Sequence, residues 1–140
     1  MNPEHVVAAI LSLFPYMSGN NRACVEHRRS EIAAQLTETA DAGVPSEIMA
    51  AVAFVETHLG CDRGEGGGWG APIDGQHRHT AGTHMHAARV LIRGLERCGD
   101  WDGSIRRFRT GLCHPTTVGT SYLRRVNLLI RRIELRAAGQ

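Results

Sequence analysis

The chain has 140 residues, of which 42% are hydrophobic and 21% are charged, a composition that excludes a disordered chain. No segment approaches the roughly 18 consecutive apolar residues that a membrane-spanning helix needs. The formal net charge of +2 conceals a basic C-terminal part, because residues 101–140 hold 8 arginines against 2 acids. A basic surface suits an anionic polymer, although a solvated helix face explains it equally well.

Helix-start signals and apolar spacing predict one mainly α-helical domain over residues 1–140. Asn2, Pro3 and Glu4 combine an N-cap, a first-turn proline and a first-turn acid, which predicts a helix over 2–17. The apolar stretch from Val6 to Phe14 lacks a preceding basic region and a small-residue cleavage site. It is therefore interpreted as part of a helix and not as a signal peptide.

Five further helices are expected from the same signals. A second helix is predicted from about 22 to 41, and a third follows Pro45 and ends at Gly60. The third helix shows an apolar stripe at helical spacing, formed by Ile48, Val52, Val55 and Leu59. The remaining helices are expected at about 83–98, 104–110 and 120–137. The intervening stretch 61–82 holds seven of the 16 glycines, and a loop of that length in a small domain is usually functional.

Four cysteines, Cys24, Cys61, Cys98 and Cys113, lie far apart and form no CxxC pair. Their spacing favours neither a zinc ribbon nor a redox motif. Their even number permits disulfides in an oxidising compartment without requiring them.

Glu56 is the main candidate for chemistry. It lies on the flank of the apolar stripe, one turn before the glycine-rich stretch, where a carboxyl group is partly desolvated and borders a cleft. Desolvation disfavours the charged form of a carboxyl group, and a general acid must carry a proton. The simpler interpretation is a surface glutamate on an amphipathic helix.

Three segments in order resemble the lytic transglycosylases and goose-type lysozymes, over about residues 30–135. Residues 44–57 resemble the family's proline-initiated apolar helix that ends in a Glu-Ser pair, with Thr57 in place of the serine. Residues 100–111 resemble its short helix ending in Tyr-Asn-x-Gly, and 122–126 resemble its final Tyr-x-x-x-Val helix. The resemblance implies a lysozyme-like domain in which the helix over 2–17 packs on a catalytic-type core.

The resemblance also implies the site residues. Glu56 would be the catalytic acid, and Thr57, Trp69, Phe108 and Tyr122 would bind substrate, with Trp69 stacking on a sugar ring. The family's Gly-Leu-Met loop motif has no clean copy here. Phe108 replaces the tyrosine that supports the acid, and Arg109 replaces the asparagine. The alternative that the protein is an inert relative that only binds glycan therefore stays open. On the expected fold Cys61 and Cys113 both flank the cleft, and a disulfide between them is one possible use of their thiols.

The implied activity is cleavage of the β-1,4 bond between N-acetylmuramic acid and N-acetylglucosamine in peptidoglycan, with no cofactor. A single catalytic glutamate favours a lytic transglycosylase over a hydrolase, which usually needs a second acid. The candidates for that second acid are Asp62, Glu65 and Asp74. The expected place of action is the bacterial cell wall or periplasm, reached without a signal peptide, for example as a virion-borne protein.

The residues leave three alternative functions open. Zinc could bind the His-x-His pairs formed by His77, His79, His84 and His86. The C-terminal arginines could bind nucleic acid, although they alternate with a core stripe and fit a solvated face better. A catalytically inert, structural lysozyme-like subunit of a virus particle or secretion assembly is the third.

Overall fold

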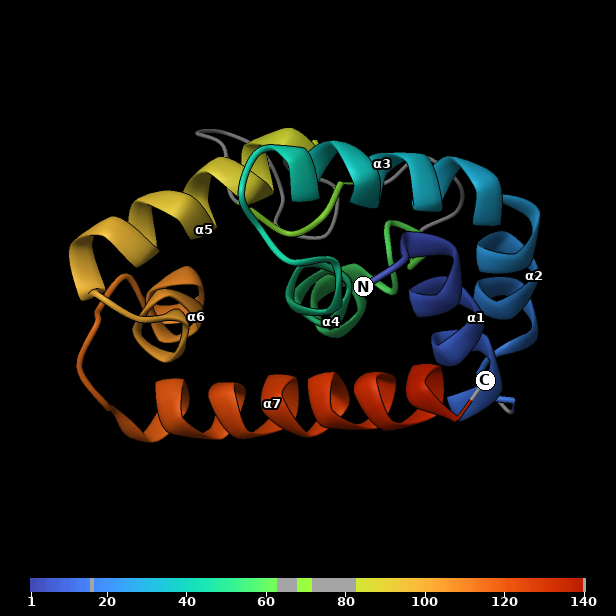
Figure 1. The fold of residues 1–140 in the computed structure, drawn as a ribbon. Coiled ribbons are helices and arrows are strands. Elements are labelled where there is room, and N and C mark those ends of the chain that lie inside the picture. Colours follow the sequence, from blue (N-terminus) through green and yellow to red (C-terminus); the bar gives the residue numbers. More distant parts are fainter. Residues whose placement is uncertain (16, 63–67, 72–82, 140) are drawn as a thin grey trace.

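The computed structural model describes residues 1–15, 17–62, 68–71 and 83–139. Within these ranges the chain forms helices and no strands, which confirms the predicted mainly α class (Figure 1). Seven helices are described: α1 (Pro3–Leu13), α2 (Gly19–His27), α3 (Arg29–Asp41), α4 (Ser46–Thr57), α5 (His84–Cys98), α6 (Trp101–Thr110) and α7 (Thr117–Ala138).

Side-chain caps fix the starts of most helices. The Asn2 side chain accepts a hydrogen bond from the Glu4 amide at 2.8 Å, as the sequence predicted for α1. Asp100 caps α6 in the same way, so that helix begins at Trp101 and not at residue 104. Thr116 caps α7, which begins three residues earlier than expected.

The segment predicted as one helix over 22–41 is two helices. The break falls at Arg28, whose backbone (φ −95°, ψ 12°) leaves the α-helical region between α2 and α3. The side chain of Arg28 is buried at this break, with 5% of the residue exposed. No proline or glycine marks the position, so the sequence carries no ordinary signal for it.

Helix α4 is the centre of the molecule. In Figure 1 it is seen nearly end-on, with α3 and α5 on one side, α7 on the opposite side and α1 beside it. Ten of its residues are buried, including Ala50, Ala51 and Ala53, which lie outside the predicted stripe. The expectation of a single apolar stripe was therefore incomplete, because a helix packed over most of its surface is apolar over most of its circumference.

Two disulfides connect neighbouring helices. Cys24 in α2 bonds to Cys61 just beyond α4, and Cys98 at the end of α5 bonds to Cys113 beyond α6. The pairing of Cys61 with Cys113 considered from the sequence is therefore wrong. The bond to Cys24 reflects the position of α2 beside the turn after α4, where Asn21 also donates a hydrogen bond to Asp62.

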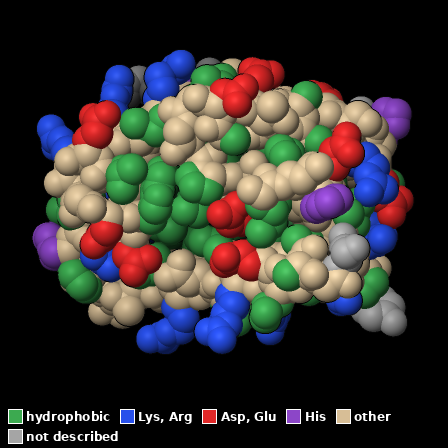
Figure 2. Space-filling model, viewed as in Figure 1, with side chains coloured by type: hydrophobic (Ala, Val, Ile, Leu, Met, Phe, Trp, Pro, Cys, Tyr) green, Lys and Arg blue, Asp and Glu red, His purple; other side chains and the backbone are tan. Residues whose placement is uncertain are grey.

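Charged side chains are distributed unevenly over the surface. In the view of Figure 2, several arginines line the lower edge, over α7, others lie at the upper left and at the right edge, and acidic side chains are scattered over the face. No helix within the described ranges combines the length and hydrophobicity needed to cross a membrane.

Candidate functional site

Glu56 lies in the last turn of the central helix and is buried. The residue is 8% exposed, and its side chain is 3% exposed. Directly after it α4 ends in a left-handed turn, because His58 (φ 50°), Leu59 (φ 59°) and Gly60 (φ 86°) all have positive φ. Non-glycine residues with positive φ are uncommon, and they cost free energy that neighbouring contacts must offset.

The hydroxyl group of Thr57 is one of those contacts. It accepts a hydrogen bond from the Gly60 amide at 2.9 Å and lies 2.8 Å from the carbonyl oxygen of Gly68, to which it donates. Thr57 is 1% exposed. The hydroxyl retained beside the acid therefore joins the left-handed turn to the segment that precedes Gly70.

Gly70 packs directly against Glu56. It has a φ of +92°, and a Cβ atom built on it would lie 2.5 Å from the Cβ of Glu56 and 2.7 Å from its Cγ. Both the backbone angle and the space require glycine at this position. The backbone of residue 70 thus forms one wall around the carboxyl-bearing side chain.

Arg109 supplies a positive charge on another side. Its Nη1 lies 3.9 Å from Oε2 of Glu56, and its guanidinium group lies 5.9 Å from the centroid of the Tyr122 ring. Arg109 is 43% exposed at the side chain, whereas Tyr122 and Phe108 are each 4% exposed. The structure therefore brings Glu56, Arg109 and Tyr122 together from α4, α6 and α7.

Trp69 occupies a packing position. It is 1% exposed, and its ring centroid lies 5.8 Å from that of His84. An indole this deeply buried presents no open face for stacking on a sugar ring in this arrangement. Its contact with a substrate stays a prediction, as do the substrate contacts of Thr57, Phe108 and Tyr122.

Arg28 was missed by sequence reasoning although it supports the same turn. Its Nη1 donates to the carbonyl oxygen of Leu59 at 3.1 Å and also lies 3.6 Å from the Sγ of Cys61. Its Nε pairs with Glu31 at 3.1 Å. The adjacent arginines at 28 and 29 give no indication of which one is buried, so only the three-dimensional packing reveals this role.

Other charged groups near the turn are already engaged. Asp62 pairs with Nδ1 of His58 and accepts a hydrogen bond from the Asn21 side chain at 3.4 Å. The other two candidates for a second acid, Glu65 and Asp74, lie outside the described residues.

The predicted zinc ligands are only partly described. His77 and His79 lie outside the described residues, and His84 pairs with Glu38 through Nε2 at 3.0 Å. Among the residues that the structure describes, no three histidine, cysteine or acidic side chains gather into a metal site. The described part of the chain thus offers no support for zinc.

Comparison with known proteins returns no family model, no curated protein and no solved structure that matches this chain.

Proposed function

We propose that the protein cleaves the glycan strands of peptidoglycan as a lytic transglycosylase, with Glu56 as its catalytic acid. The observation that carries the proposal is the burial of Glu56, whose side chain is 3% exposed and is walled by the backbone of Gly70. Surface glutamates on amphipathic helices do not have such a setting. The resemblance of residues 44–57, 100–111 and 122–126 to that family supplies the reaction class.

In the proposed reaction Glu56 donates its proton to the glycosidic oxygen as the bond between that oxygen and the anomeric carbon breaks. The resulting carboxylate then takes the proton of the muramic acid 6-hydroxyl group. The 6-oxygen bonds to the anomeric carbon, and a 1,6-anhydro product is formed. One carboxyl group serves both steps, so the reaction needs no second acid, which accords with the engagement of Asp62 by His58 and Asn21.

The two disulfides support action outside the cytoplasm. Disulfides persist in oxidising compartments and are rare where thiols are kept reduced. Both bonds, Cys24–Cys61 and Cys98–Cys113, suit a protein that works at the cell wall or is carried on a virus particle.

The test is mass spectrometry of the products released from purified peptidoglycan. We expect anhydro-muropeptides from the wild-type protein and from Glu47→Gln, a matched change on the same helix, and none from Glu56→Gln. Circular dichroism would show that each variant folds. Reducing-end products would instead indicate a hydrolytic lysozyme, and an absence of products from folded wild-type protein would refute cleavage.

A glycan-binding protein without activity is the second candidate. In this candidate the fold and the binding of glycan persist while the chemistry is absent. The lack of a hydroxyl group at Phe108 removes the support that the resemblance would give to the acid. Co-sedimentation with insoluble peptidoglycan, without soluble products, would identify this function.

A further inference from the structure

Helix α7 carries two leucines whose exposure the fold does not explain. Leu128 is 51% exposed and Leu135 is 66% exposed, and their spacing of seven residues places them on the same side of the helix. The opposite side buries Val126 and Ile133 in the core, and Leu129, about 100° around the helix from Leu128, is buried as well. Helix α7 therefore has a second apolar stripe, formed by Leu128 and Leu135, that faces solvent.

Arginines border this stripe on both sides. At about 100° per residue, Arg125 and Arg132 lie roughly 40–60° to one side of Leu128, and Arg124 and Arg131 lie equally far to the other. All four are exposed. Outward leucines between two rows of cations are a feature shared with helices that lie in a membrane interface.

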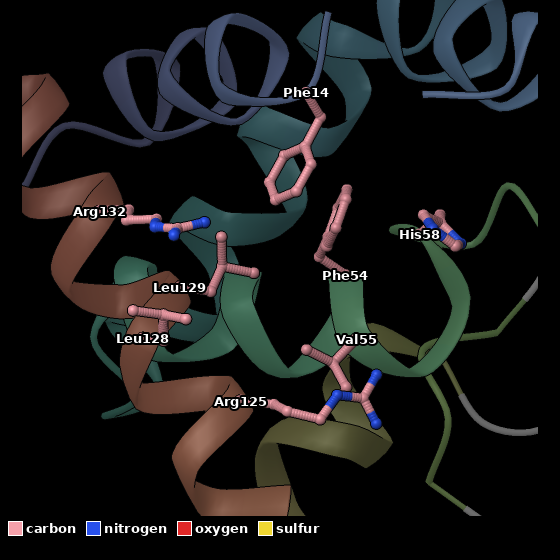
Figure 3. A pocket seen from close by; sticks show the side chains of 8 residues that line it. All are labelled: Phe14, Phe54, Val55, His58, Arg125, Leu128, Leu129 and Arg132. Atoms are coloured by element: carbon pink, nitrogen blue, oxygen red, sulfur yellow. The ribbon is translucent and has the colours of Figure 1, made fainter. Parts of the chain in front are cut away.

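The stripe continues into a hollow between α7, α4 and the end of α1. Figure 3 shows this pocket, of about 250 Å³, with Leu128 and Leu129 on α7 and the rings of Phe14 and Phe54 beyond them. These two rings stack with centroids 4.6 Å apart. Arg125 and Arg132 extend from α7 at two sides of the same pocket.

Two neighbouring hollows enlarge the apolar surface. One, of about 490 Å³, shares Phe14, Phe54 and His58 with the first, and the other brings Leu13 and Leu135 together beside Arg132. Among the described residues that line the three hollows, none is acidic. The surface around the three hollows therefore combines apolar side chains with arginines, and no acidic side chain among the described lining residues neutralises their charge.

We propose that this face of α7 binds the surface of an anionic phospholipid membrane, with Leu128 and Leu135 inserted among the acyl chains. The arginines would bind lipid phosphates. Because phosphates recur across a lipid surface, Arg125 and Arg132, two helical turns apart, can each pair with one. The hollow beside Phe14 would take part of an acyl chain. This inference goes beyond the proposed function, since it concerns a different face and does not depend on cleavage.

The test is sedimentation of the whole protein with vesicles of phosphatidylcholine alone or mixed with phosphatidylglycerol. We expect binding to the mixed vesicles that weakens as salt is added, and little binding to phosphatidylcholine. Arg125→Gln with Arg132→Gln should lower the partition coefficient about 25-fold, from about fivefold for each arginine. Leu128→Ser with Leu135→Ser should also lower it, although the charge is unchanged.

The matched control is Arg89→Gln with Arg93→Gln, which removes the same charge from two exposed positions on α5. It should retain wild-type binding, and circular dichroism would show that all variants fold. An equal loss in this control, an unchanged partition of the leucine variant, or no binding to either vesicle would overturn the proposal. Tighter binding to an acidic amphipathic peptide than to vesicles would also overturn it, in favour of a protein partner.

Discussion

Replacing Gly70 with alanine tests the packing around Glu56. The added Cβ would lie 2.5 Å from the Cβ of Glu56, so about 1 Å of movement is needed to restore ordinary contact. The positive φ of +92° adds backbone strain of about 1–2 kcal/mol for a residue with a side chain. Overpacking adds about 1–3 kcal/mol. We therefore expect the free energy of unfolding to fall by about 3 kcal/mol in total.

Gly99→Ala is the matched control for the strain alone. Gly99 also has a positive φ, +86°, but a Cβ built on it meets nothing within 4 Å. This variant should lose only about 1–2 kcal/mol. The difference between the two variants, measured by urea denaturation followed by circular dichroism, isolates the contact with Glu56. Equal losses in the two variants would refute the packing argument.

The same pair of variants also bears on activity. A displacement of about 1 Å at a catalytic group can lower the rate about 100-fold. If Glu56 is the acid, Gly70→Ala should lose about that much turnover of peptidoglycan below its unfolding temperature, while Gly99→Ala keeps wild-type turnover. Full turnover in Gly70→Ala, together with the expected loss of stability, would confirm the packing against Glu56 and contradict the role of Glu56 as the acid.

Two further predictions concern the turn after α4 and the disulfides. Thr57→Val should cost about 2 kcal/mol in urea denaturation because the Gly60 amide and the Gly68 carbonyl lose their buried partner, whereas Thr57→Ser should stay close to wild type; equal losses would show that the hydroxyl group is dispensable. Replacing the two cysteines of a disulfide with serine should lower the free energy of unfolding by about 4 kcal/mol for Cys24–Cys61 and by about 3 kcal/mol for Cys98–Cys113. The first loss is larger because its cysteines are 37 residues apart, against 15 for the second pair. The reverse order would contradict a chain-entropy origin of their stabilisation.

Local signals in the sequence were sufficient for much of the fold. The mainly α class and the cap at Asn2 follow from side chains that act within one turn, and the structure confirms both. The break at Arg28 could not be predicted, because no proline or glycine marks it and the buried side chain there bonds to the Leu59 carbonyl, 31 residues away in the sequence. The pairing of Cys24 with Cys61 depends on the same long-range packing.

The candidate site was only partly predictable for the same reason. Glu56 stands out in the sequence because it lies on an apolar helix, and the structure shows that it is buried. The wall at Gly70 and the guanidinium group of Arg109 come from separate segments, and no local pattern indicates that they converge on Glu56. Trp69 stands out as an aromatic in a glycine-rich stretch, but its burial depends on contacts that local spacing does not encode.

The burial of most of α4 has a consequence for how this sequence can diverge. A larger side chain at Ala50, Ala51 or Ala53 would displace a neighbouring helix, since each of these residues is 0% exposed. Exposed positions on α7, such as Leu135 and Arg136, face no such restriction from the core. Relatives that keep this fold should therefore differ least along α4, and their small residues there should persist even where the helices around it have changed almost completely.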